Sequence, residues 1–172
     1  LELLELLRES IERGFAGFTI HYQPQVDTRT GVLQGAEALA RWHCSKYGDI
    51  SPGEFIPLLE QNGLIIQLGR WIFCHAAAQC RECGFKPDFR MSINLSYVQL
   101  TEGDIIPYIG DTLKELDLEA SHVVMELTET YLAKADDRIL QMLRDMKAIG
   151  IQVAMDDFGV GYSSLFSLKN IP

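Results

Sequence analysis

Apolar residues in this chain follow a helical period in some segments and a strand-like pattern in others. In the first segment leucine and isoleucine recur every three or four residues, which predicts a helix over residues 1–13. Two strand-like runs follow, at 18–26 and 32–42, and a turn sequence at 27–31 separates them. Because a connection this short joins antiparallel neighbours, we expect these two strands to form a hairpin.

Beyond residue 42, helical and strand-like segments alternate. Strands are predicted at 89–95, 123–127 and 151–155, and helices at 52–62, 65–83, 104–116, 136–149 and, more briefly, near 163–169. This alternation is typical of a parallel sheet covered by helices. The sequence contains no tandem repeat, low-complexity tract or linker. We therefore interpret it as one domain, or part of one.

Polar residues stand at the ends of the predicted parallel strands. Asn94, Glu126 and Asp156 follow one another at steps of 32 and 30 residues, each about one strand-plus-helix unit. We expect these side chains to lie side by side at the C-terminal ends of the strands, where barrel enzymes keep their active sites. Glu37, on the second strand, is the natural fourth member. Three carboxylates and one amide oxygen form a set of ligands that suits a hard divalent cation.

A second interpretation of these residues stays open on the pattern alone. Asp156 and Asp157 are adjacent carboxylates after a buried strand, and such a pair is costly to bury unless a cation or a proton lies between them. Aspartate is also common in turns and helix caps, so one could cap the next helix while the other is solvated. Each of the other strand-end residues could likewise be a helix cap or a hydrogen-bonded turn residue.

Composition narrows the class of protein. With 172 residues, 47% of them hydrophobic, the chain is long enough to bury one sizeable core. A net charge of −9 argues against non-specific binding to nucleic acid or to anionic membranes, but a metal ion could still attract a small phosphorylated ligand. Cys80-x-x-Cys83 has no second pair to complete a zinc site, so we interpret the four cysteines as reduced thiols of a cytoplasmic protein. No apolar run has the length of a transmembrane helix.

Six short motifs, in collinear order, cover nearly the whole chain. They are Tyr-Gln-Pro at 22–24, Glu-Ala-Leu-Ala-Arg-Trp at 37–42, Pro-Gly-Glu-Phe-Ile-Pro at 52–57, Asn-Leu-Ser at 94–96, Glu-Leu-Thr-Glu at 126–129 and Asp-Asp-Phe-Gly-Val-Gly-Tyr-Ser-Ser-Leu at 156–165. With these motifs the chain resembles the EAL-domain cyclic di-GMP phosphodiesterases. The resemblance implies an α/β fold, a TIM-like barrel whose first strand is antiparallel.

The resemblance also implies a function and a role for each site residue. The activity would be metal-dependent hydrolysis of cyclic di-GMP to linear pGpG in bacterial second-messenger signalling. One Mg²⁺ or Mn²⁺ would be held by Glu37, Asn94, Glu126 and Asp156, and a second by Asp157 with Asp156 bridging; Glu37, Asp156 and Asp157 are the catalytic candidates. The dinucleotide would contact Gln23, Leu39 and Arg41, while Glu129 would position the loop after the fifth strand. A homodimer, with sensor or GGDEF domains elsewhere in the same polypeptide and a possible membrane tether there, is also implied.

The resemblance is incomplete at the C-terminal end. Members of the family continue with a strand carrying Lys-Ile-Asp and a later strand carrying a glutamate, whereas this sequence stops at Pro172. Because such barrels have about 250 residues, we interpret residues 1–172 as a partial EAL domain with about five of eight strands. We expect this piece alone to be inactive and to associate through its open strand edges. Two other functions stay open: a cyclic di-GMP receptor or interaction module without activity, and a metal-dependent barrel enzyme of unrelated chemistry.

Overall fold

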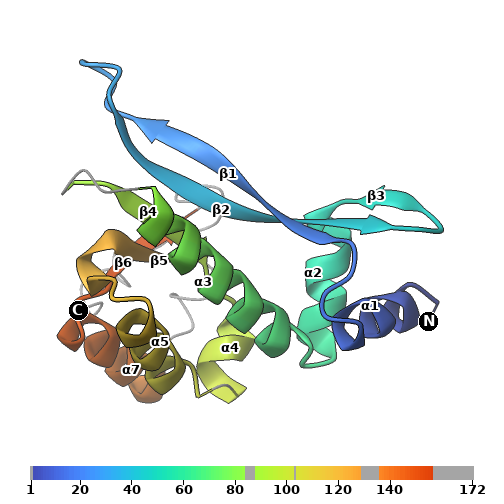
Figure 1. Ribbon diagram of the computed structural model, residues 1–172. Coiled ribbons are helices and arrows are strands. Elements are labelled where there is room, and N and C mark those ends of the chain that lie inside the picture. Colours follow the sequence, from blue (N-terminus) through green and yellow to red (C-terminus); the bar gives the residue numbers. More distant parts are fainter. Residues whose placement is uncertain (1, 84–87, 103, 129–135, 157–172) are drawn as a thin grey trace, which may run out of the picture.

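The computed structural model describes residues 2–83, 88–102, 104–128 and 136–156 (Figure 1). The first half contains α1 (Glu2–Glu12), β1 (Phe18–Val26), β2 (Leu33–Cys44), β3 (Gly48–Ile50), α2 (Pro52–Gln61) and α3 (Ile65–Glu82). The second half contains β4 (Arg90–Asn94), α4 (Tyr97–Glu102), α5 (Ile105–Glu115), β5 (Val123–Thr128), α7 (Asp137–Ala148) and β6 (Gln152–Asp156). The predicted helix near 163–169 lies outside the described residues.

One sheet organises the described chain, in the order β1-β2-β4-β5-β6. β1 and β2 form the predicted antiparallel hairpin, while β2, β4, β5 and β6 run parallel to one another. The prediction of a mixed sheet with an antiparallel first strand is therefore confirmed. Pro24 lies on β1, an outer strand of this sheet, where a residue without a backbone N–H is tolerated.

Local sequence signals account for where several elements begin and end. Ser51 caps α2, and its hydroxyl accepts a hydrogen bond from the backbone N–H of Gly53 at 3.3 Å. Asp136 caps α7 in the same way, accepting from the N–H of Ile139 at 2.9 Å. In the β1–β2 turn, the carboxylate of Asp27 accepts hydrogen bonds from the N–H groups of Arg29 and Thr30. These caps and the turn fix the connections between elements.

Two short elements were not predicted from the sequence. β3 has three residues and pairs antiparallel with the end of β2. α4 has six residues and follows β4 directly. Both are too short to show a hydrophobic period, so pattern analysis alone could not find them. α4 nevertheless matters for the site, because it begins only three residues after Asn94.

Two groups of buried side chains hold the sheet to its helices. The larger lies between β4 and β5 and the helices α3, α5 and α7, which Figure 1 shows together on one side of the sheet. The smaller joins α1, α2 and α3 to the hairpin, and it includes Phe18, Trp42 and Phe55, whose ring centroids are 5.7–6.1 Å apart. No helix in the described part of the chain is long and apolar enough to cross a membrane. In the described part of the chain, α3, α5 and α7 therefore cover one face of the sheet (Figure 1).

Candidate metal and ligand site at the strand ends

Alternation along β2 separates core residues from candidate site residues. Ala36 and Ala38 are buried against the helices, whereas Glu37, Leu39 and Arg41 are half-buried on the opposite face. Gln23 on β1 pairs directly with Glu37, and side chains of directly paired residues share a face. The candidate ligand-contacting residues and the first candidate metal ligand thus lie on one face of the hairpin.

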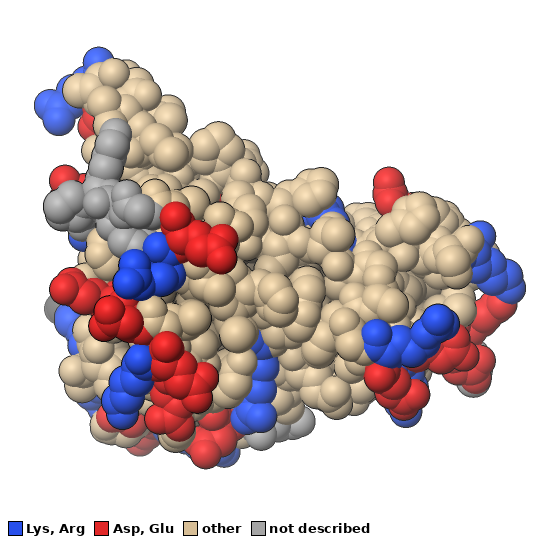
Figure 2. All heavy atoms as spheres, in the orientation of Figure 1, with Lys and Arg blue, Asp and Glu red and all other residues tan. Residues whose placement is uncertain are grey.

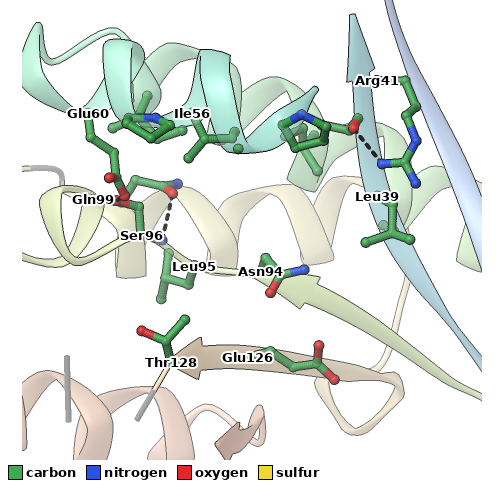
Figure 3. A pocket seen from close by; sticks show the side chains of 18 residues that line it. Leu39, Arg41, Ile56, Glu60, Asn94, Leu95, Ser96, Gln99, Glu126 and Thr128 are labelled. Atoms are coloured by element: carbon green, nitrogen blue, oxygen red, sulfur yellow. Dashed lines mark hydrogen bonds between the residues drawn. The ribbon is translucent and has the colours of Figure 1, made fainter. Parts of the chain in front are cut away.

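The same face continues across β4 and β5. Asn94, the last residue of β4, and Glu126, two residues before the end of β5, are direct cross-strand partners and lie on neighbouring strands in Figure 3. The side-chain amide of Asn94 donates a hydrogen bond to the carboxylate of Glu37, with 2.8 Å between Nδ2 and Oε1. Three predicted ligands from three strands therefore converge, although 89 residues separate the first from the last along the chain.

The register differs in detail from the sequence prediction. Glu37 pairs with Ser92, two residues before Asn94, and Asp156 pairs with Thr128, two residues after Glu126. Asn94 and Glu126 are level as expected, whereas the expectation that Asp156 is level with them is wrong by two residues. The two-residue step between Glu37 and Asn94 keeps both side chains on the same face of the sheet, because side chains alternate with a period of two. A regular stagger of this kind is expected where strands tilt to form a barrel.

The residues present have the chemistry that a hard cation requires. Because Nδ2 of Asn94 donates to Glu37, the amide oxygen is left as the ligand atom of Asn94. Two carboxylates and this oxygen suit Mg²⁺ or Mn²⁺, with the fourth ligand expected from Asp156. Within the described ranges no three His, Cys, Asp or Glu side chains form a cluster. The side chain of Asp156, and the whole of Asp157 and Glu129, lie outside the described residues, so their assigned roles stay predictions.

A cavity of about 590 Å³ opens beside these strand ends (Figure 3). This volume is in the range of small-molecule sites. Polar groups on its wall come from β2, β4 and β5: Arg41, Asn94, Glu126 and Thr128. Apolar groups come mainly from α2 and α3: Pro52, Ile56, Pro57, Ile65 and Ile72. A ligand with flat apolar parts and negative charge would find both kinds of contact here.

Arg41 supplies the positive charge on the cavity wall. Its guanidinium donates one hydrogen bond from Nη1 to the carbonyl oxygen of Ala40 at 2.8 Å. The fork of a guanidinium has five N–H donors and matches a phosphate in geometry, so Arg41 retains the capacity for a bidentate contact. Leu39 lies two residues earlier on the same face and lines the same cavity.

Three further side chains near the site were missed by sequence reasoning. The hydroxyl of Ser96 donates to the carboxylate of Glu60 at 2.5 Å, and the N–H of Ser96 donates to the side-chain oxygen of Gln99 at 3.0 Å. All three residues line the cavity. Ser96-x-x-Gln99 has the spacing of a helix capping box and could have been found in the sequence. The partnership with Glu60, 36 residues away, could not.

Charges of both signs are interspersed on the face of the molecule in Figure 2. Lys and Arg side chains lie next to Asp and Glu side chains over the helices, and no continuous basic stripe crosses this face. With a net charge of −9, this pattern does not favour a polyanionic nucleic acid as the ligand. The local positive charge of Arg41 suits a small phosphorylated molecule better.

Together the fold and the site define a class. An antiparallel hairpin leading into a parallel sheet, with carboxylate and amide side chains at the strand ends, is part of a TIM-like barrel with its site at the usual place. A family model described as the EAL domain matches residues 5–172, and the chain belongs to this family.

Known relatives share both sequence and structure with the chain. MucR of Pseudomonas aeruginosa, a "bifunctional diguanylate cyclase/cyclic di-GMP phosphodiesterase", is 38% identical over 174 residues; the match covers all of this chain and 25% of that protein. The solved MucR phosphodiesterase in complex with c-di-GMP has a TM-score of 0.90 and 38% identity, over 100% of this chain and 70% of that one. The EAL enzyme Bd1971 with cAMP and cyclic di-GMP bound has a TM-score of 0.89 and 29% identity, over 99% and 47%. The chain thus spans about a quarter of the length of its curated relative.

Proposed function

We propose that the protein containing this chain hydrolyses cyclic di-GMP to linear pGpG with a divalent metal ion. The observation that carries the proposal is the convergence of Glu37, Asn94 and Glu126 at the edge of a cavity that also contains Arg41. Membership of the EAL-domain family and the cyclic di-GMP bound in solved relatives support the choice of substrate.

In this proposal the ligands of the metal ion come from four strands. Glu37, Asn94, Glu126 and Asp156 hold Mg²⁺ or Mn²⁺, and Asp157 shares a second ion with Asp156. When bound, the metal activates water as a nucleophile and neutralises charge on the phosphate. The contact between Asn94 and Glu37 holds two of the ligands in a fixed relation before the ion arrives.

The remaining residues bind the dinucleotide. Arg41 offers two parallel N–H groups to a phosphate, which both neutralises charge and fixes orientation. Leu39 presents an apolar side chain on the cavity wall, where the flat surface of a guanine base can pack. Gln23, exposed and opposite Glu37, can donate or accept a hydrogen bond at the rim. Glu129 is assigned to the positioning of the loop after the fifth strand.

The test is product analysis with the intact protein, cyclic di-GMP and Mg²⁺ or Mn²⁺, followed by chromatography and mass spectrometry. We expect pGpG as the product, and we expect Glu37→Ala to abolish its formation. Glu115→Ala removes an exposed carboxylate on α5 that does not line the cavity, and serves as the matched control. Binding of cyclic di-GMP without any turnover would identify a receptor and overturn the proposed activity.

For the intact protein we further propose a homodimer that carries sensor or diguanylate cyclase domains beside this one. The support is that MucR is described as bifunctional and that the chain covers only a quarter of it. Light scattering of the intact protein, with and without cyclic di-GMP, tests the dimer: a mass of two chains is expected, and a monomer under both conditions would contradict it.

A further inference from the structure

The turn that follows Asn94 is held by hydrogen bonds to residues of two helices, α2 and α4. Ser96 begins α4: its hydroxyl accepts from the N–H of Val98 at 3.3 Å while it donates to Glu60 at the end of α2. Gln99, one turn into α4, reaches back and accepts from the N–H of Ser96. The Ser96 backbone and hydroxyl thus have partners on two helices at once, and Figure 3 shows these groups together on one wall of the cavity.

Close packing against α3 leaves Gln99 little freedom. Gln99 is 4% exposed, and a Cβ added to Gly69 on α3 would lie 1.9 Å from its side-chain nitrogen. Only a glycine at position 69 therefore leaves room for Gln99 in this conformation. A buried polar side chain fitted this closely acts as a rigid support for its partner, here the N–H of Ser96.

The supported turn is continuous with the metal-ligand candidates. The N–H of Leu95 donates to the carbonyl oxygen of Glu126 at 2.8 Å, which extends the pairing of β4 and β5 by one residue. Asn94 therefore contacts Glu37 on one neighbouring strand and pairs with Glu126 on the other. Two residues later, Ser96 is held by its hydrogen bond to Glu60. Any shift of Ser96 changes where β4 ends and where the Asn94 amide points.

We propose that Ser96, Glu60 and Gln99 are positioning residues that set the divalent-cation affinity of the site by fixing the end of β4. The inference rests on the proposed function, because it requires that Asn94 bind the metal. None of the three touches the ion or the substrate phosphates in this proposal. They act only through the backbone of residues 94–96, as outer partners of metal ligands do elsewhere.

The alternative is that these hydrogen bonds only cap a six-residue helix. A cap would affect folding stability, whereas a positioning role would also affect cation affinity in protein that is fully folded. The two are separated by titrating the intact protein with Mn²⁺ and measuring the free ion by electron paramagnetic resonance, with circular dichroism to confirm folding at the same temperature.

Ser96→Ala removes the hydroxyl and its contact with Glu60 and is the first variant. We expect its Mn²⁺ dissociation constant to rise about tenfold, in line with the loss of an outer partner of a metal ligand. Thr112→Val is the matched control: Thr112 is similarly buried, and its hydroxyl donates to the carbonyl of Tyr108 within α5, away from the site. The control should lose stability without losing affinity.

A pair of substitutions at Glu60 keeps the test valid even if Ser96→Ala does not fold. Glu60 is only partly buried, and Glu60→Gln keeps an oxygen that can accept from Ser96, whereas Glu60→Ala removes it. We expect Glu60→Ala to weaken Mn²⁺ binding about tenfold and Glu60→Gln to retain most of it. Equal weakening by both would show that the charge of Glu60 matters rather than its hydrogen bond, and would overturn the inference.

The outcomes also separate this inference from the proposed function. If the unaltered protein binds Mn²⁺ and the Ser96 and Glu60 variants bind it equally well, the positioning role is wrong and the metal site stands. If the unaltered protein binds no Mn²⁺ at millimolar concentration, the proposed function fails and the inference fails with it.

Discussion

The two faces of the parallel strands differ sharply although their residues alternate along the same backbone. On the face under the helices, Met91, Ile93 and Met125 are at most 2% exposed and pack in one continuous core. On the other face, Asn94 is exposed and Glu126 is half-buried, one residue along from Ile93 and Met125. A step of one residue therefore passes from a side chain that stabilises the fold to one that contributes little to it.

This contrast indicates which residues are present for chemistry. An apolar residue on the covered face is explained by the area that it removes from water. The paired carboxylate of Glu126 and amide of Asn94 have no such explanation, and partial burial of the carboxylate charge opposes folding unless a partner compensates it. Stability and function should therefore be separable by substitutions at adjacent positions, and the predictions below test that separation.

The largest effect is expected for a change of charge on the open face, which is the face of the sheet that carries Asn94 and Glu126. Glu126→Gln keeps the shape of the side chain but removes one anionic metal ligand, so hydrolysis of cyclic di-GMP should fall more than about a hundredfold. Even outer partners of metal ligands commonly change metal affinity or activity 10–100-fold, and a direct ligand should exceed that. Steady-state kinetics measures the loss, with Glu115→Gln on α5 as control. Activity within tenfold of the unaltered protein would remove Glu126 from the site.

Adjacent substitutions on β4 compare the two faces directly. Ile93→Ala should lower the free energy of unfolding by about 2–5 kcal/mol, because a fully buried side chain is lost from the core. Asn94→Ala should lower it by about 1 kcal/mol or less, since only one exposed hydrogen bond is lost, while abolishing Mn²⁺ binding. Urea denaturation and metal titration on the same samples provide both values. Similar losses of stability in the two variants would mean that the faces are not separable.

A smaller effect is expected for Arg41, which in this account contacts the dinucleotide rather than the metal. Arg41→Ala should raise KM for cyclic di-GMP about tenfold with little change in kcat, because a charged hydrogen bond contributes about 1.5–3 kcal/mol to binding. Arg41→Lys should recover only part of the loss, since an ammonium group cannot make the bidentate contact. An effect on kcat alone would instead assign Arg41 to the transition state.

The smallest effect concerns how tightly α3 packs against the sheet face that it covers. Burial raises the pKa of the Cys80 thiol on α3 to about 11, whereas Cys83, one turn later, is exposed. Iodoacetamide at pH 8 should therefore modify Cys83 long before Cys80, as peptide mass spectrometry can show. As the pH rises, the Cys80 thiol loses its proton at a lower pH in the unfolded chain than in the folded protein. The contribution of Cys80 to folding stability should therefore fall as the pH rises from about 9 to 11. Equal labelling rates in the folded protein would show that α3 opens readily.

Sequence reasoning recovered the parts of the fold that produce a periodic pattern. The long strands and helices, the antiparallel hairpin and the shared face of Glu37, Asn94 and Glu126 follow from periods of 2 and 3.6. Stagger between strands does not appear in the spacing along the chain, so Asp156 was expected level with Glu126 although it pairs two residues further on, and the offset of Glu37 from Asn94 was not predicted. Strand tilt decides the stagger, and tilt is a property of the whole sheet.

The contacts that support the end of β4 were predictable only where residues close in sequence act together. Ser96 and Gln99 form a local cap whose spacing can be recognised. The approach of Glu60 to Ser96, and of Gly69 to Gln99, depends on how α2 and α3 pack against the end of β4. Tertiary packing of this kind leaves no signal in a single sequence.

The most direct test of the account is the position of the metal ion in a crystal of the intact protein grown with Mn²⁺, located by anomalous scattering. We predict one ion coordinated by the side-chain oxygens of Glu37, Asn94, Glu126 and Asp156, with distances near the roughly 2.1 Å typical of a small hard cation. An ion bound elsewhere, or no ion at a saturating concentration while Asn94 still donates to Glu37, would contradict the central claim.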